Sequence, residues 1–210
     1  MTIHVCMVTR NKSISATTLH TAMNIHMLCM QKGEHIEIHF VDTKSQLPKL
    51  IKTGERIIWM DYGTNLNMEI LSKAVEPFEK GIQVLVFPSV KEGIDWQMFE
   101  RKTKAGSKES PSQRGLSFDT EVGKKLAEGL YECEKTSARV WAMDGKPVDK
   151  KLRGGKDPVK LPLENNEEMF ARLKSLGVKI GVASEALVVC HFVHECFGNI
   201  LEASGVQLQP

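Results

Sequence analysis

The chain has 210 residues, of which 41% are hydrophobic and 26% charged, so it is long enough and apolar enough for a globular domain with a buried core. The formal net charge of +2 gives no broad electrostatic attraction to nucleic acid, which we therefore exclude from the expected partners. Five irregularly spaced cysteines, no basic signal region and no apolar run of roughly 18 residues predict a cytoplasmic chain without disulfides or a membrane span.

The first part of the chain alternates between strand and helix patterns. Apolar runs predict strands at residues 3–8, 36–41 and 82–87, and a further strand in the stretch 56–63 that ends at Asp61. Helical spacing of apolar residues predicts helices at 17–30, 46–51 and 67–78. This alternation predicts an α/β domain with a mostly parallel, mixed central sheet flanked by helices.

The second half of the chain is less regular. The sequence predicts helices at residues 121–131, 166–176 and 185–204, strands at 139–143 and 178–183, a strand or turn at 116–119, a turn at 144–147, and loops at 91–96, 102–114 and 149–162. No internal repeat, low-complexity tract or clear boundary interrupts the pattern, so we predict a single domain over residues 1–210.

Several common functional motifs are missing from the sequence. No Gly-x-Gly-x-x-Gly follows the first strand and no Walker loop is present, which argues against dinucleotide-binding and P-loop enzymes. No Gly-x-Ser-x-Gly elbow, paired Cys-x-x-Cys or His-Glu-x-x-His motif indicates a hydrolase or a zinc site. The histidines of the N-terminal part follow no pattern that predicts a role; they are His4, His20, His26, His35 and His39.

Polar residues follow each of the first three predicted strands. Thr9 and Arg10 follow the first, Asp42 and Thr43 the second, and Asp61 the third. If these strands are parallel neighbours, the five residues line one crevice at the carboxyl ends of the sheet. There Asp42 could accept hydrogen bonds from a base or ribose, Arg10 could pair with a phosphate, and Asp61 could bind a hard divalent cation. Each could instead be a surface turn residue, and Asp61 could cap the next helix.

Two later segments carry residues that suit a sugar. The loop 92–96 contains Glu92, Asp95 and Trp96, and carboxylates accept hydroxyl hydrogen bonds while indole offers an apolar face with a polar edge. The alternative is a capped turn in which Trp96 is buried. Asp119 could serve as a catalytic base or bind the acceptor, and it could equally cap a helix.

The order of these features resembles a GT-A glycosyltransferase. The similarity lies in a strand followed by Thr9-Arg10, a helix, a strand ending in Val41-Asp42, and an apolar strand ending in Trp59-Met60-Asp61-Tyr62-Gly63. Residues 56–71, including the helix start Asn67-x-Glu69-Ile70-Leu71, are similar to the family's segment around its Asp-x-Asp motif. The chain as a whole also looks like the small glycosyltransferases of large DNA viruses, such as chlorella viruses.

The resemblance implies a site for a nucleotide diphosphate sugar and a cation, Mn²⁺ or Mg²⁺, on the diphosphate. It implies that residues 1–90 bind the nucleotide and residues 91–210 bind the sugar and acceptor. Gly63 stands where the family has its second aspartate, so another ligand is needed, and the family's use of a late histidine makes His191 the candidate. The segment around His191 could instead bind zinc or form a core helix, and the domain could have lost its metal dependence or activity.

We therefore predict a metal-assisted transferase that moves a hexose from a nucleotide diphosphate donor, a uridine one, to a carbohydrate or glycoprotein acceptor, in the host cytoplasm if the protein is viral. The assigned roles are nucleotide binding by Thr9, Arg10, Asp42 and Asp61, metal binding by Asp61 and His191, catalysis by Asp95 and Asp119, and sugar or acceptor binding by Glu92 and Trp96. The alternatives are a non-catalytic nucleotide- or glycan-binding module of the same fold and a Rossmann-type transferase with another cofactor.

Overall fold

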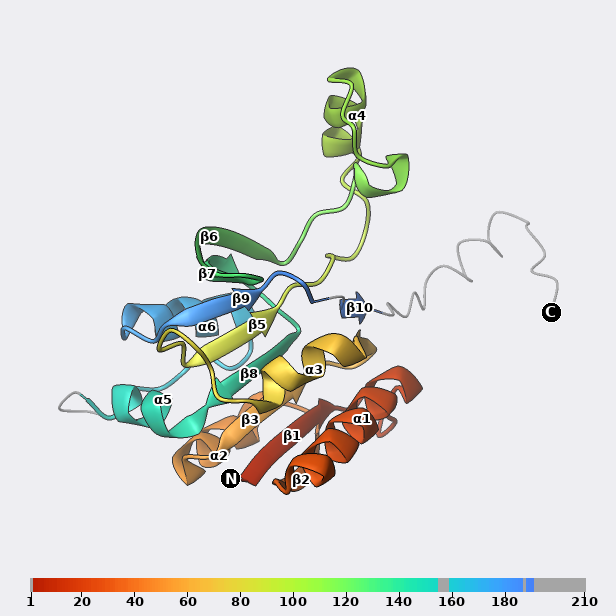
Figure 1. Cartoon of the computed structure of the whole chain (residues 1–210). Coiled ribbons are helices and arrows are strands. Elements are labelled where there is room, and N and C mark those ends of the chain that lie inside the picture. The colour runs from red at the N-terminus through yellow and green to blue at the C-terminus, as the bar shows by residue number, and fades with distance from the viewer. Residues whose placement is uncertain (1, 155–158, 187, 191–210) are drawn as a thin grey trace.

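The computed structural model describes residues 2–154, 159–186 and 188–190, and its centre is an eight-stranded sheet with the order β2-β1-β3-β8-β5-β9-β7-β6 (Figure 1). The strands of this sheet are β1 (Thr2–Val8), β2 (His35–Val41), β3 (Arg56–Met60), β5 (Val84–Phe87), β6 (Thr120–Ala127), β7 (Leu130–Thr136), β8 (Val140–Asp144) and β9 (Ile180–Ala183). A separate antiparallel pair joins β4 (Thr64–Leu66) to β10 (Val188–Cys190).

The sheet is mixed, as predicted, but three of its seven strand pairs are parallel and four are antiparallel, so the pairing is not mostly parallel. β1 lies between β2 and β3 and is parallel to both, and β5 is parallel to β9. β8 is antiparallel to β3 and β5, and β7 is antiparallel to β6 and β9. Only β7 and β8 therefore run against the direction of the other strands, and the parallel trio β2-β1-β3 brings its carboxyl ends to one edge.

Helices cover both faces of the sheet. α1 (Ala16–Lys32) and α3 (Met68–Val75) pack on one face, and α2 (Leu47–Thr53), α5 (Gly145–Leu152) and α6 (Asn166–Ser175) pack on the other. In β3 the alternation of side chains sends Ile57 and Trp59 to the α2 face and Ile58 and Met60 to the α1 face. Because both faces are covered, all five residues of this central strand are buried.

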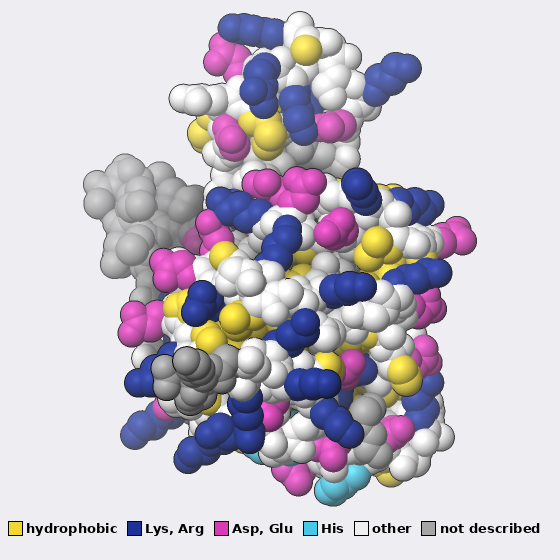
Figure 2. Space-filling model, turned by 90° about the vertical axis from the view of Figure 1, so that its left-hand side faces the viewer, with side chains coloured by type: hydrophobic (Ala, Val, Ile, Leu, Met, Phe, Trp, Pro, Cys, Tyr) yellow, Lys and Arg dark blue, Asp and Glu magenta, His cyan; other side chains and the backbone are white. Residues whose placement is uncertain are grey.

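One helix stands away from the rest of the domain. α4 (Trp96–Lys104) and the short 3₁₀ turn η2 (Pro111–Gln113) project from the edge of the body (Figure 1), and the space-filling view shows them as a separate lobe (Figure 2). No residue of α4 is buried. Among the described residues, no helix has both the length and the apolar character that a membrane crossing requires.

The predicted helix at 121–131 is wrong, because this segment forms the hairpin of β6 and β7. Gly129 adopts a left-handed conformation (φ 65°) in the short connection after Ala127, which a glycine tolerates without strain. β7 pairs with β9 and places Cys133 in the core. The lysine-rich sequence of β6 has helix propensity, but pairing with β7 overrides it, because β7 is itself held in the sheet by β9.

The predicted turn at 144–147 and loop at 149–162 are also wrong in part, because α5 occupies residues from Gly145 onwards. Pro147 lies in the first turn, where a missing N–H is tolerated, and Val148 and Leu152 are buried four residues apart. The predicted final helix at 185–204 begins instead with β10, which pairs with β4. The rest of that predicted helix lies outside the described residues.

Candidate functional site

A cleft of about 550 Å³ lies at the carboxyl ends of β1, β2 and β3, and we call it the strand-end cleft. Its lining residues are Val8, Thr9, Arg10, Asp42, Thr43, Lys44, Trp59, Asp61, Tyr62, Glu92 and Arg139. The predicted nucleotide-binding residues Thr9, Arg10, Asp42 and Asp61 therefore meet in one place, and Glu92 joins them. They meet because β1 is hydrogen-bonded to both of its parallel neighbours, so the three strands end side by side.

A tight turn directly after β1 fixes the position of Arg10. Arg10 and Ser13 exchange backbone hydrogen bonds of 3.0 and 2.9 Å, and the two residues between them, Asn11 and Lys12, have φ angles of 51° and 59°. Two successive positive φ angles define a type I′ turn, which reverses the chain at the mouth of the cleft. A lysine in this region is uncommon, and such conformations concentrate at binding sites.

Thr9 links the ends of β1 and β2. Its backbone N–H donates to the carbonyl of Val41 (2.8 Å), which extends the strand pairing by one residue. Its hydroxyl donates to Oδ1 of Asp42. Thr9 thus orients the Asp42 carboxylate at the cleft rim, and it lines the cleft itself.

Asp61 lies deeper in the cleft, with 23% of its side chain exposed. The indole N–H of Trp59 donates to Oδ1 (2.8 Å), and Nε of Arg139 lies 3.9 Å from Oδ2. Burial raises the pKa of Asp61, and the Trp59 hydrogen bond, Lys44 and Arg139 lower it in part, while Asp119 adds a raising effect. The fold therefore holds a carboxylate where its ionised form is disfavoured, which is typical of functional positions.

The turn after Asp61 explains the glycine in its motif. Thr64 donates to the Asp61 carbonyl from both its N–H (3.3 Å) and its hydroxyl (2.6 Å), and the chain then enters β4. Gly63 has φ 76° in this turn, a value that an aspartate adopts only with strain. A second carboxylate at position 63 is therefore disfavoured by the backbone itself.

Two cationic residues of the cleft were not predicted. Lys44 follows Asp42-Thr43, and its ammonium lies 5.9 Å from the centroid of the Trp59 ring. Arg139 donates to the carbonyl of Tyr62 (2.6 Å), and its own carbonyl accepts from the N–H of Asp61 (3.0 Å). Arg139 precedes β8, an antiparallel strand that begins where its neighbours end. Arg139 is therefore not among the polar residues that follow strands. The sequence signal that indicates it is a polar residue directly before an antiparallel strand.

Several predicted sugar-site residues lie elsewhere. Asp95 caps α4, accepting from the N–H of Met98 (2.8 Å), and Trp96 is 68% exposed on the same helix with its ring against Phe99. Neither lines the strand-end cleft. The capped-turn alternative is confirmed for Asp95, but the expectation of a buried Trp96 is wrong. The predicted metal ligand His191 lies outside the described residues.

Asp119 is buried beneath the end of β5 and is held by several hydrogen bonds. Oδ1 accepts from the N–H of Ser89 (3.0 Å) and the hydroxyl of Thr120 (2.8 Å), and Oδ2 accepts from the hydroxyl of Ser89. The side chain does not line the strand-end cleft, although its charge acts on Asp61. These contacts support a structural role, since they join the end of β5 to the start of β6.

We expect Asp119→Ala to lower the free energy of unfolding by about 1–3 kcal/mol, because the buried N–H of Ser89 loses its acceptor. Urea denaturation measures this loss. Asp119→Asn keeps one acceptor oxygen and should lose less. An Asn variant that keeps wild-type stability but loses turnover of a sugar donor would instead support the predicted catalytic role.

Comparison with known proteins assigns no family to the chain. No protein-family model matches it, and no match was found among the curated proteins. Among solved structures, the chain is similar to the crystal structure titled A197 from STIV, with a TM-score of 0.49 and 10% sequence identity over 91% of this chain and 85% of that chain. A likeness this weak carries no argument about function.

Proposed function

We propose that the strand-end cleft binds a nucleotide diphosphate sugar, with uridine as the base, and that the chain is a GT-A-like glycosyltransferase moving a hexose to a carbohydrate acceptor. One observation carries the proposal. Polar side chains from the ends of three adjacent parallel strands meet in a single cleft of about 550 Å³, within the usual range for small-molecule sites. Ligands of open α/β sheets bind at this edge.

The charges of the cleft suit a diphosphate flanked by hydroxyl groups. Arg10, Lys44 and Arg139 bring three cationic side chains to the lining, and guanidinium groups bind phosphate oxygens in pairs. Asp42, held by Thr9, offers a carboxylate that accepts hydrogen bonds from ribose or base. Glu92 is the carboxylate that the later half of the chain contributes to the lining, so it takes the sugar-facing role in this proposal.

The residues present fit a cation that arrives with the diphosphate. Oδ1 of Asp61 accepts from Trp59, so Oδ2, which has Nε of Arg139 3.9 Å away, is the oxygen that would face Mn²⁺ or Mg²⁺. Mg²⁺ is commonly held by one or two carboxylates together with phosphate oxygens and water, so a single aspartate suffices. When bound, the cation would neutralise charge on the departing diphosphate. Lys44 and Arg139 supply positive charge on the same side of the cleft.

The second candidate function is a non-catalytic nucleotide- or glycan-binding module of the same fold. The observation in its favour is that neither Asp95 nor Asp119, the predicted catalytic carboxylates, lines the cleft. A carboxylate base would be needed for inversion of the sugar configuration. In the transferase proposal this role passes to Glu92.

Calorimetry with UDP, GDP and ADP, each with and without Mn²⁺, tests the binding step. We expect UDP to bind the wild type, and Arg10→Gln to weaken binding about tenfold or more, because a charge-assisted hydrogen bond contributes about 1.5–3 kcal/mol. The matched control is Arg101→Gln on the exposed surface of α4, which should bind as the wild type does.

The result that overturns the proposal is a wild-type chain that binds none of these nucleotides. If UDP binds, release of free sugar or transfer from a uridine donor separates an enzyme from a binding module. Equal UDP affinity with and without Mn²⁺ would show that no cation takes part in binding, and the proposed nucleotide site would still stand.

A further inference from the structure

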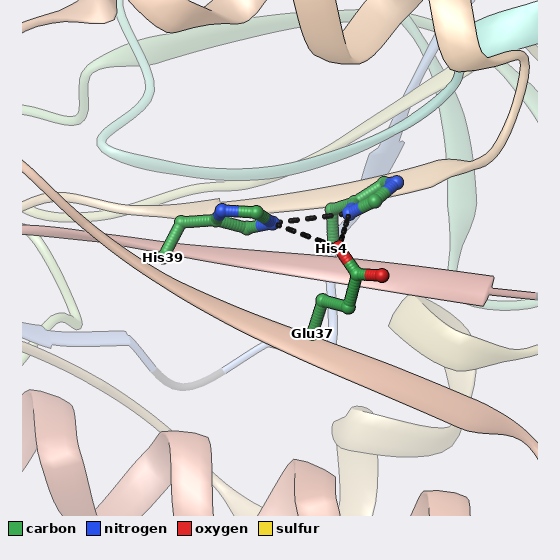
Figure 3. A group of neighbouring side chains, drawn as sticks. All are labelled: His4, Glu37 and His39. Atoms are coloured by element: carbon green, nitrogen blue, oxygen red, sulfur yellow. Dashed lines mark hydrogen bonds and ion pairs between the residues drawn. The ribbon is translucent and has the colours of Figure 1, made fainter.

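A second group of potential ligands lies on β1 and β2, outside the lining of the strand-end cleft. His4 is on β1, and Glu37 and His39 are on the neighbouring edge strand β2. In the parallel register His4 is opposite Glu37, and His39 is two residues further along β2, so all three side chains emerge on the face that α2 covers. Figure 3 shows the three side chains pointing toward one another. We call them the edge cluster.

The distances within the edge cluster match those between ligands of one metal ion. Nδ1 of His4 lies 3.0 Å from Nε2 of His39 and 3.3 Å from Oε2 of Glu37, and the last two atoms are 3.7 Å apart. Tetrahedral zinc with bonds of about 2.0–2.1 Å separates its ligand atoms by roughly 3.3 Å. The three measured separations lie on both sides of this value, so an ion can bind with small side-chain movements.

The second nitrogen of His4 has a partner on α2. Nε2 lies 3.4 Å from the hydroxyl oxygen of Thr53, and that hydroxyl already donates its hydrogen to the carbonyl of Leu50 (2.7 Å). When Nδ1 of His4 binds an ion, the hydrogen on Nε2 therefore has the oxygen of Thr53 as an acceptor. A hydrogen bond to the second nitrogen is the usual support of a metal-binding histidine.

Burial separates this cluster from ordinary surface groups. The side chain of His4 is 6% exposed and that of Glu37 is 48% exposed, so one ligand lies inside and the carboxylate faces the solvent. The pair of imidazoles and one carboxylate is a donor set typical of zinc and related transition metals, and it leaves one position open for water. A hard ion such as Mg²⁺ would prefer more oxygen ligands.

We propose that His4, Glu37 and His39 bind a divalent transition-metal ion of the Zn²⁺ class, with water as the fourth ligand. The ion joins the edge strand β2 to β1. This site is distinct from the strand-end cleft, because none of its three side chains lines the cleft, and its nearest member, His39, lies three residues before Asp42 along the extended chain, roughly 10 Å at about 3.3 Å per residue. Failure of nucleotide binding therefore leaves this proposal untouched.

Competition against a chromophoric zinc chelator, on the full chain after removal of metal, tests the site. Residues 190–196 carry two further cysteines and two further histidines, so the measured quantity is the number of zinc equivalents lost on substitution. We expect His39→Gln and Glu37→Gln each to lose one tight equivalent or to weaken it at least tenfold. His26→Gln, at an exposed position of α1, is the matched control and should keep every equivalent.

A thermal-unfolding series with and without zinc provides the second readout. Zinc should raise the melting temperature of the wild type and of His26→Gln, since an ion that binds only the folded chain stabilises it, and should raise that of Glu37→Gln less. Glu37 is half exposed, so its variant tests the site even if a variant at buried His4 fails to fold. The proposal is overturned if Glu37→Gln and His39→Gln retain the zinc equivalents and the zinc-induced stabilisation of the wild type.

Discussion

Replacing Arg56 by alanine is expected to lower the free energy of unfolding by about 3–5 kcal/mol, the range for breaking a buried ion pair from one side. Only 1% of the Arg56 side chain is exposed, and Nε donates to Oδ1 of Asp144 at 2.7 Å. The guanidinium also donates to the carbonyls of Ala74 and Glu76, at 2.8 Å each, and lies 3.8 Å from the centroid of the Phe78 ring.

The effect is large because one side chain connects three elements. Arg56 begins β3, Asp144 ends the antiparallel neighbour β8, and the two carbonyls end α3. Truncation leaves two carbonyls and a carboxylate without their donor, and each lost acceptor partner costs about 1–3 kcal/mol where it is buried. Burial lowers the pKa of Arg56, and Asp144 opposes this, so the pair keeps the guanidinium charged inside the protein.

Urea denaturation of Arg56→Ala and of a surface control measures the difference. Lys104→Ala removes an exposed pair with Glu100 on α4 and should change the free energy of unfolding by no more than about 1 kcal/mol. An Arg56→Ala protein as stable as this control would contradict the structural role of Arg56. Asp144→Asn retains an acceptor oxygen, so we expect it to fall between the two.

The parallel strands and the positions of their ends could be predicted from the sequence. Apolar runs that stop abruptly at Thr9, Asp42 and Asp61 mark the ends of three strands, and parallel pairing then brings these residues together without further information. The prediction that these residues meet in one cleft is confirmed, because it depended on strand direction alone.

Residues that depend on strand pairing could not be predicted in the same way. Arg139 reaches the cleft because β8 inserts antiparallel between β3 and β5, and no local pattern shows which strands β8 joins. Likewise the hairpin of β6 and β7 follows from pairing with β9 rather than from its own propensity. The edge cluster could be predicted from the sequence only in part. Glu37 and His39 alternate along β2, which is visible in the sequence, but the contribution of His4 needs the register.

Asp61→Asn is expected to have two opposite effects, a loss of cation-dependent nucleotide binding and a gain in stability. Asparagine keeps an oxygen that accepts from Trp59 but removes the charge that would bind the cation, so Mn²⁺ should no longer strengthen UDP binding. The folded protein raises the pKa of Asp61 above the ordinary value of 3.8, which means that ionised Asp61 destabilises the fold. Removing that charge should therefore raise the free energy of unfolding at pH 7.

The pH dependence of this gain separates a binding residue from a structural one. A carboxyl group whose pKa is higher in the folded state loses stability as pH rises through its unfolded pKa, so the variant's advantage should be present at pH 7 and disappear well below pH 3.8. The matched control is Asp149→Asn, which removes a carboxylate paired with Arg153 on α5 and should bring no gain. Thermal unfolding at both pH values, together with calorimetry of UDP and Mn²⁺, tests both effects on the same proteins. An Asp61→Asn protein that is less stable at pH 7 and keeps its Mn²⁺-dependent affinity would show that the Asp61 carboxylate serves its contacts with Trp59 and Arg139 rather than a cation. Lys44 and Arg139 would then be left as the groups that receive the diphosphate.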